Sequence, residues 1–323
     1  MPEIMIEISD LTRNYGSTKA LDSIGFQVQR GEVMGFLGPN GAGKTTAMRI
    51  LAGILAPTEG SVHVAGLDMI ANPVAARAKI GFLPESPPVY DEMTVREYLT
   101  YLAGLRRVPR ARLRGAVEHT MDRCGLKHVA DRLLRNLSKG YQQRAGIAQA
   151  IVHSPEVVIL DEPTVGLDPI QIREIRQLVR ELGGEHSVLL STHILPEVRM
   201  TCNRVAVINQ GRIVANDTLE GLEQKAASSG SFFIRWLRPP DPELLRQVPG
   251  VACIQEKQGG WTITPCKGED PIPELVHRSA AQAWDLRELV PTGESLEEIF
   301  LHLTTREEDG ETSAVETSRE VLS

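Results

Sequence analysis

The stretch of sequence that decides the fold reads Gly38-Pro39-Asn40-Gly41-Ala42-Gly43-Lys44-Thr45, with Thr46 directly after it. It matches the phosphate-binding pattern G-x-x-x-x-G-K-[ST]. It also has the expected apolar strand before it and a predicted helix after it. Glycines let backbone amides close around phosphate oxygens, and a helix start near Gly43 adds partial positive charge. A chance glycine-rich turn would lack both flanking elements, so the stretch predicts a nucleotide-phosphate site.

Two carboxylates after a second apolar run supply the catalytic half of this predicted site. The run 157–160 ends in Asp161 and Glu162. We expect Lys44 to bridge the β- and γ-phosphates, and Thr45 and Asp161 to hold Mg²⁺. Glu162 is then placed to act as a general base or to orient the attacking water. An acidic pair after a strand is by itself more often a solvated loop, and the phosphate-binding stretch reverses that preference.

A second helix start offers another phosphate-binding geometry, in the string Leu137-Ser138-Lys139-Gly140-Tyr141-Gln142-Gln143-Arg144. Ser138 and Gly140 lie just ahead of a helical run, 145–152, where a helix start presents free amides. The first stretch already surrounds one face of the nucleotide, so the second is best used on nucleotide held by another copy of the chain. A plain N-cap serine is the alternative for an isolated Leu-Ser-x-Gly.

This string resembles the signature sequence of ABC-type ATPases, and it stands between the two halves of the site as that family requires. Lys139 replaces the usual glycine and Tyr141 the usual glutamine. The form is similar to ATPases of the ABC-2 export branch, including gliding-motility, copper-site maturation and multidrug or polysaccharide exporters. The resemblance covers residues 4 to about 217 and weakly the segment 295–300. It implies an α/β P-loop NTPase fold, ATP and Mg²⁺ as cofactors, and ATP-driven transport through a separate membrane permease.

The resemblance assigns further roles one residue at a time. Tyr15 matches the aromatic that stacks on adenine, Asp168 the loop that touches the opposite subunit, and His193 the switch histidine that contacts the γ-phosphate. Glu85 occupies the position of a glutamine that links Mg²⁺ and water to the membrane partner, and a carboxylate also suits Mg²⁺. Strand-end packing, a helix cap and a structural histidine are the ordinary alternatives for the first three.

The predicted site has three sets of residues. The predicted catalytic residues are Glu162, His193, Lys44 and Glu85, and the predicted metal ligands are Thr45, Asp161 and Glu85. The predicted nucleotide-binding residues are Tyr15, Gly38, Pro39, Asn40, Gly41, Ala42, Gly43, Lys44, Thr45, Thr46, Ser138, Gly140, Asp161 and Asp168.

Alternating β-type and helical runs predict the architecture of a large domain, 1–224. It should hold a mostly parallel sheet covered by helices, with a small antiparallel sheet from the alternating segments 5–8 and 25–28. After Pro84 the sequence pattern changes from that of strands to that of helices. This change predicts a helical insertion at about 84–153, with a capping box at Thr94 and Glu97. The predicted main strands are 32–37, 79–83, 157–160, 187–191 and 204–209, and the predicted inserted helices are 94–105 and 110–124.

A small polar stretch at 225–231 predicts a boundary to a second domain, 225–305. The order of elements there is βαββαβ, which predicts a small α+β ferredoxin-like unit. We expect a closing helix at 295–303 and a disordered acidic tail at 306–323. A structural or dimer-stabilising role is favoured over ligand sensing, although such folds host many functions. The predicted elements are strand 232–237, helix 242–248, a hairpin of 251–255 and 261–264, helix 273–283 and strand 285–290.

Composition limits the classes of function. Of 323 residues 41% are hydrophobic and 24% charged, as in ordinary globular proteins, and no run reaches the ~20 apolar residues of a membrane span. The N-terminus lacks a secretory signal, so we expect the chain in the cytosol, peripheral on the inner face of the membrane through its permease. A net charge of −7 disfavours general nucleic-acid binding. The four cysteines lie far apart, which indicates neither zinc nor disulfides.

Two rival hypotheses come from other classes. The first is a soluble ABC-type ATPase that acts as a mechanical clamp on the ribosome or DNA; a single P-loop and the lack of sustained heptads disfavour it. The second is a regulatory module that binds nucleotide without useful hydrolysis, which intact Glu162 and His193 disfavour. The preferred mechanism is that two copies close head-to-tail over two ATP molecules, that closure drives the permease, and that hydrolysis resets it.

Overall fold

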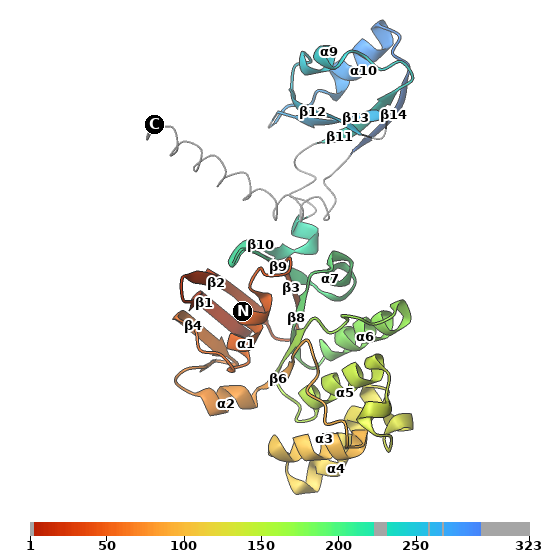
Figure 1. The fold of residues 1–323 in the computed structure, drawn as a ribbon. Helices are drawn as coiled ribbons and strands as arrows, with labels where there is room; N and C mark the ends of the chain where they lie inside the picture. The colour runs from red at the N-terminus through yellow and green to blue at the C-terminus, as the bar shows by residue number, and fades with distance from the viewer. Residues whose placement is uncertain (1–2, 223–230, 258, 267, 292–323) are drawn as a thin grey trace, which may run out of the picture. The chain divides into compact units, whose positions relative to one another are not determined.

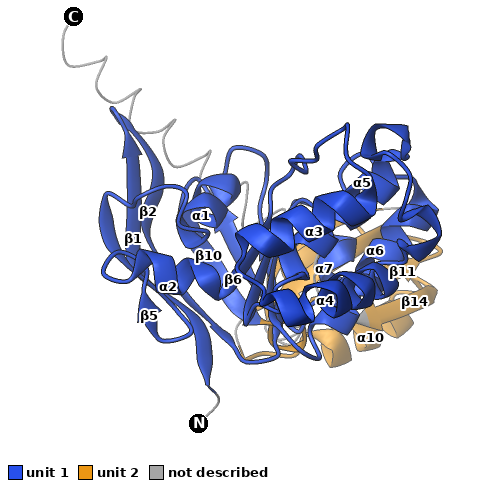
Figure 2. Cartoon of the chain, turned by 90° about the horizontal axis from the view of Figure 1, so that it is seen from below, with its two compact units in different colours: residues 1–217 blue, residues 218–323 orange. Residues whose placement is uncertain are grey.

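The computed structural model describes residues 3–222, 231–257, 259–266 and 268–291 (Figure 1). Two compact units divide the chain, residues 1–217 and residues 218–323 (Figure 2). The predicted boundary stretch 225–231 falls almost entirely outside the described residues, as do the predicted closing helix 295–303 and the predicted tail 306–323. These features therefore stay predictions.

The first unit is built on a six-stranded sheet of order β10-β9-β3-β8-β7-β6. Pairing is parallel from β9 through β6, and every residue of β3, β7 and β8 is buried. Apolar, β-branched strands of this kind suit a sheet covered on both faces, so the predicted mostly parallel sheet is confirmed. The strands are β3 (Val33–Leu37), β6 (Ile80–Leu83), β7 (Val157–Asp161), β8 (Ser187–Thr192), β9 (Arg204–Asn209) and β10 (Arg212–Thr218).

The predicted antiparallel sheet also forms, in the order β2-β1-β4-β5. Ile6 pairs with Val28 and Ile8 with Phe26, so the two alternating segments face each other. Their inward side chains join one buried cluster with residues of the main sheet and of helix α1 (Lys44–Leu51). The phosphate-binding stretch therefore leads into a helix that is anchored in the shared core. The strands are β1 (Ile4–Tyr15), β2 (Thr18–Gln29), β4 (Glu59–Val64) and β5 (Leu67–Asp68).

Helices α3, α4 and α5 form the predicted insertion, away from the antiparallel sheet (Figure 1). The capping box is confirmed: the Glu97 backbone N–H donates to the Thr94 side chain, and the Glu97 carboxylate accepts from the Thr94 N–H. The N-cap position of Ser138 agrees with the predicted helix start, whereas the predicted helical run, 145–152, begins too late, because α5 begins at Lys139 and its first turn contains no aliphatic side chain. The helices are α2 (Pro73–Ala78), α3 (Val95–Leu105), α4 (Arg110–Arg123), α5 (Lys139–Ile151), α6 (Pro169–Leu182) and α7 (Leu195–Thr201), with short 3₁₀ turns at Lys127–Val129 and Leu134–Asn136.

The second unit has the predicted βαββαβ order, with an antiparallel sheet of order β12-β13-β11-β14. Its core centres on Trp236 and Trp284, whose rings pack edge to face at 5.8 Å. The Trp236 indole N–H donates to the Ser279 hydroxyl at 2.7 Å, so its polar edge is satisfied inside the core. The elements are β11 (Phe232–Trp236), α9 (Pro242–Arg246), β12 (Val251–Lys257), β13 (Gly260–Pro265), α10 (Ile272–Ala281) and β14 (Leu286–Pro291).

Gly81 tests the tight packing of β6 against α5. A methyl group added there would lie 2.0 Å from the carbonyl oxygen of Ala150. We expect Gly81→Ala to destabilise the first unit by about 1–3 kcal/mol, because strand and helix must separate. Gly115→Ala is the matched control: it lies in α4 with nothing within 4 Å among the described residues, so helix propensity alone should make it neutral or stabilising. Thermal unfolding of both variants measures this, and equal melting of Gly81→Ala and wild type would contradict it.

Candidate nucleotide-hydrolysis site

The loop between β3 and α1 has the backbone of a phosphate cradle. Gly43 caps α1 in the left-handed region, with φ 104°, and a Cβ there would lie 2.5 Å from the Ala20 carbonyl oxygen. A Cβ at Gly38 would lie 2.4 Å from the Ile208 carbonyl oxygen. Both positions therefore require glycine for space, and only Gly43 also for conformation. The Lys44 ammonium donates to the Gly38 and Pro39 carbonyls at 2.8 and 3.1 Å, which folds its side chain back across the loop.

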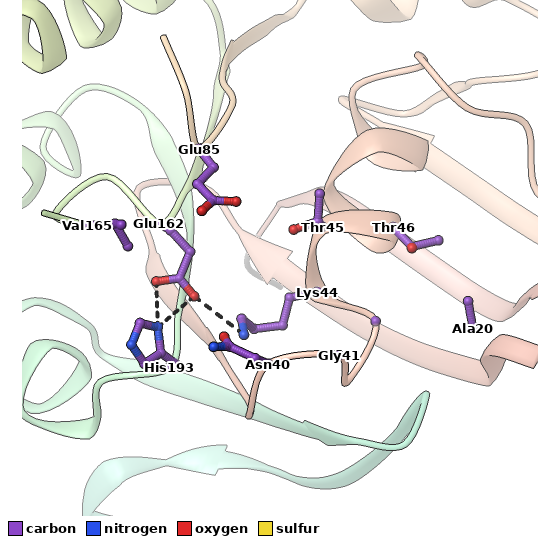
Figure 3. A pocket seen from close by; sticks show the side chains of 11 residues that line it. Ala20, Asn40, Gly41, Lys44, Thr45, Thr46, Glu85, Glu162, Val165 and His193 are labelled. Carbon is purple, nitrogen blue, oxygen red and sulfur yellow. Dashed lines mark hydrogen bonds and ion pairs between the residues drawn. The ribbon is translucent and has the colours of Figure 1, made fainter.

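A pocket of about 460 Å³ opens beside this loop (Figure 3). Its volume lies within the roughly 300–1,000 Å³ of small-molecule sites. Nine of the sequence-predicted site residues line it, from four separate segments of the first unit. Two lining residues, Ala20 and Val165, were not predicted. The lining comprises Ala20, Asn40, Gly41, Gly43, Lys44, Thr45, Thr46, Glu85, Glu162, Val165 and His193.

Glu162 lies between Lys44 and His193 in this pocket (Figure 3). One carboxylate oxygen is 3.4 Å from the Lys44 Nζ, and the other is 2.9 Å from the His193 Nδ1. Glu162 and Lys44 are each only 6% exposed, so their attraction is weakly screened by solvent. The backbone of Glu162 is in the left-handed region, φ 48°, a conformation that costs about 1–3 kcal/mol for a residue with a Cβ. The fold therefore holds this carboxylate in a strained, fixed position.

Asp161 lies at the end of β7, 1% exposed. Burial raises the pKa of its carboxyl group, and the neighbouring carboxylates of Glu162 and Glu85 act in the same direction. The hydroxyls of Ser191 and Thr45 are close enough to lower that pKa in part. They make no well-formed hydrogen bond to Asp161 Oδ1, which has no partner within the described part of the chain.

The unpartnered oxygen is the observation that tests the Mg²⁺ prediction. A buried carboxylate oxygen without a partner is unfavourable, and a hard cation would satisfy it. Thr45 and Glu85 line the adjoining pocket, so the donor set fits Mg²⁺. Among the described residues no group of three or more His, Cys, Asp or Glu side chains forms a metal site by itself. A cation at this position would take its remaining ligands from water and from phosphate oxygens, as Mg²⁺ commonly does in nucleotide sites.

Comparisons with known proteins indicate the family to which this chain belongs. Residues 21–165 match the family described as ABC transporter. The chain is 37% identical to the bacitracin transport ATP-binding protein BcrA of Bacillus licheniformis, over 68% of this chain and 72% of that protein. It belongs to the ABC transporter ATP-binding proteins. A second relative, the Nod factor export ATP-binding protein I of Paraburkholderia xenovorans (strain LB400), is 35% identical over 95% of this chain and 99% of its own length.

A solved structure gives the same assignment for the fold. It is described as the dimeric post-hydrolysis state of the ATP-binding cassette MJ0796 bound to ADP and Pi. It superposes with a TM-score of 0.60 at 25% identity, over 67% of this chain and 99% of that one. This ABC transporter subunit is therefore an ATP-binding P-loop NTPase and an ATPase. None of its helices within the described residues is long and apolar enough to cross a membrane.

Several predicted nucleotide contacts of this ABC ATPase lie outside the pocket of the described chain. Ser138 is the N-cap of α5, and Gly140 packs against the Gln171 side chain. Asp168 caps α6 by accepting from the Ile170 and Gln171 amides. Tyr15 ends β1 and is 47% exposed, and the Arg13 guanidinium lies over its ring at 4.8 Å from the centroid. Because these residues lie outside the pocket of one copy, their predicted roles in nucleotide binding stay predictions. The remaining predicted residues, Gly38, Pro39, Ala42 and Asp161, lie in the loop and strand behind the pocket.

The substitution Asp161→Asn should raise the stability of the folded state while it abolishes ATPase activity. Because burial raises the pKa of Asp161, the ionised form penalises the folded state at every pH above the unfolded pKa of about 3.9. The neutral amide removes this penalty, so the nucleotide-free variant should be more stable at pH 7, on the order of 1 kcal/mol, while ATPase activity is lost.

The measurement is thermal unfolding against pH without nucleotide or Mg²⁺. The advantage of Asp161→Asn should shrink as the pH falls through the folded pKa towards about 4. Asp168→Asn is the matched control, because asparagine is an equally good N-cap and Asp168 is exposed, so its stability should not change. A variant less stable than wild type at pH 7 would contradict the electrostatic account.

Proposed function

We propose that this subunit is the ATPase of an ABC-2 type exporter, in which two copies close over two Mg-ATP molecules and drive a separate membrane permease. Each nucleotide would lie between the Lys44 loop of one copy and the Ser138 helix start of the other. The chain would then act on the cytosolic face of the membrane. The exporter assignment rests on the Leu-Ser-Lys-Gly string and on its similarity to the Nod factor export protein.

The observation that carries the proposal is the position of Glu162 in the pocket. Its carboxylate faces the space next to the Lys44 ammonium, where the terminal phosphate of ATP would approach. Lys44 and the loop amides would stabilise charge on the phosphates, while Glu162 would orient and polarise the attacking water. His193, within hydrogen-bond distance of both Glu162 oxygens, would hold the carboxylate in place and contact the γ-phosphate. Mg²⁺, when bound, would neutralise the phosphate charge beside Thr45 and Asp161.

The need for a second copy follows from what the pocket lacks. The described lining supplies the loop and the catalytic carboxylate, but the amides of the α5 start do not reach it. Ser138 has extended backbone and no side-chain bond into the helix, so the first-turn amides of α5 are free to bind an anion. A partner's nucleotide is the anion that the signature resemblance implies.

The proposed permease contact lies beside Glu85. Tyr90 packs edge to face against Tyr98 and Tyr101, and the Tyr98 hydroxyl donates to the Pro88 carbonyl at 3.3 Å. Tyr90 and Tyr101 keep large exposed surfaces. Two exposed aromatic rings that pack against each other, with a buried ring behind one of them, are suited to receive a short helix of another protein. Because Tyr90 lies five residues after Glu85, this segment would couple that contact to the nucleotide.

Glu162→Gln tests the assigned base. We expect ATP turnover to fall by about 100-fold or more, because the amide cannot take a proton, while ATP binding remains and the closed dimer accumulates. Phosphate release measures turnover, and light scattering or sedimentation with ATP measures dimerisation. Lys44→Ala is the contrasting variant and should lose ATP binding itself. Normal turnover in Glu162→Gln would remove Glu162 from the mechanism.

A double substitution of Tyr90 and Tyr101 by alanine tests the proposed permease contact. The isolated subunit should keep its ATPase rate, since neither ring lines the pocket, but it should no longer co-purify with the proposed permease. Ile70→Ala is the matched control, because Ile70 is also a large exposed hydrophobic residue but lies near α2. Equal co-purification of the double variant and the control would place the contact elsewhere.

A further inference from the structure

Glu197 is a buried carboxylate that no motif of the sequence singles out. It lies in the first turn of α7 and is 1% exposed. Its Oε1 accepts from the Thr164 hydroxyl at 2.6 Å and from the Arg176 Nη2 at 3.3 Å, and its Oε2 accepts from the Thr192 hydroxyl at 2.8 Å. Three donors from three elements thus converge on one carboxylate.

These bonds connect the two segments that carry the proposed catalytic groups. Thr192 directly precedes His193, and its hydroxyl also accepts from the Ile194 N–H at 3.1 Å, which fixes the turn around the histidine. Thr164 lies two residues after Glu162, in a turn closed by the Val165 and Leu167 amides. That turn continues to Asp168, the residue expected to meet the opposite copy. Glu197 therefore ties the loop of the base to the loop of the histidine.

The energetics favour a fixed arrangement. A buried carboxylate is strongly unfavourable unless it is paired and hydrogen-bonded, and here hydroxyl and guanidinium donors satisfy both oxygens. Removing one donor leaves a buried acceptor with fewer partners, so the two loops resist separate movement. The distance of 2.9 Å between His193 and Glu162 depends on the relative position of these loops.

We propose that Glu197 is a positioning residue for ATP hydrolysis. Through Thr192 it holds His193 against Glu162, and through Thr164 it couples that pair to the turn that leads to the opposite subunit. The inference rests on the proposed roles of Glu162 and His193. It predicts that the network affects the hydrolysis step far more than ATP binding, because none of its members lines the described pocket.

Single hydroxyl removals test the network with little change of shape. We expect Thr192→Val and Thr164→Val each to lower kcat by about 10-fold, with less than about a 3-fold change in ATP affinity. Thr201→Val is the matched control: Thr201 lies in the helix of Glu197 and is also buried, but its hydroxyl has no partner among the described residues. It should leave kcat unchanged. Glu197→Gln keeps one carbonyl acceptor, so it should retain more activity than Glu197→Ala.

The His193→Ala background distinguishes positioning from general stability. If Glu197 acts through the histidine, Thr192→Val should lower kcat in the wild type but add almost nothing to His193→Ala. An equal loss in both backgrounds, or an unchanged kcat in folded Thr192→Val, would overturn the inference. A normal kcat in His193→Ala would instead overturn the proposed role of the histidine, and this inference with it. Thermal unfolding of every variant shows that the comparison is made on folded protein.

Discussion

The ion pair between Lys44 and Glu162 is the interaction on which the rest of the site depends. The two charged groups lie 3.4 Å apart and both residues are 6% exposed; the ammonium belongs to the first residue of α1 and the carboxylate to the residue directly after β7. The parallel sheet brings these two strand ends to one edge, because β3 and β7 both pair with β8. A site assembled at the carboxyl ends of neighbouring parallel strands is what this kind of sheet favours. The chemistry is thus a consequence of strand order.

Local motifs explain why much of this site could be predicted from sequence. The glycines and Lys44 follow one another in the chain, so their spacing alone determines the cradle, and a strand that ends in Asp161-Glu162 carries its carboxylates to the same edge. The antiparallel sheet and the βαββαβ unit were predictable for the same reason, since period-2 alternation is read within a few residues. The start of α5 was placed late because its first turn, 139–142, contains no aliphatic side chain, which hides the helical period.

Contacts made by tertiary packing could not be read in this way. Ala20 reaches the pocket from β2, and nothing in its neighbourhood indicates a nucleotide site. Glu197 looks like an ordinary acidic residue in the first turn of a helix, which is its usual place. Its role depends on α7 lying close enough for Thr164, 33 residues away, to donate to it. Such a contact has no sequence signal, because the partners belong to different periodic segments.

The charges around the pocket also make the binding of the nucleotide and the binding of the cation depend on each other. Glu85 and Glu162 line it, Asp161 lies behind it, and Lys44 is the one Lys or Arg among the described lining residues. By formal charge the carboxylates outnumber the ammonium, so a triphosphate entering alone would meet repulsion of about 1–4 kcal/mol for each charge pair at 4 Å. Helix-start amides offset part of this, and a divalent cation beside Asp161 would offset the rest. Triphosphate and Mg²⁺ should therefore bind as a complex, each much weaker without the other.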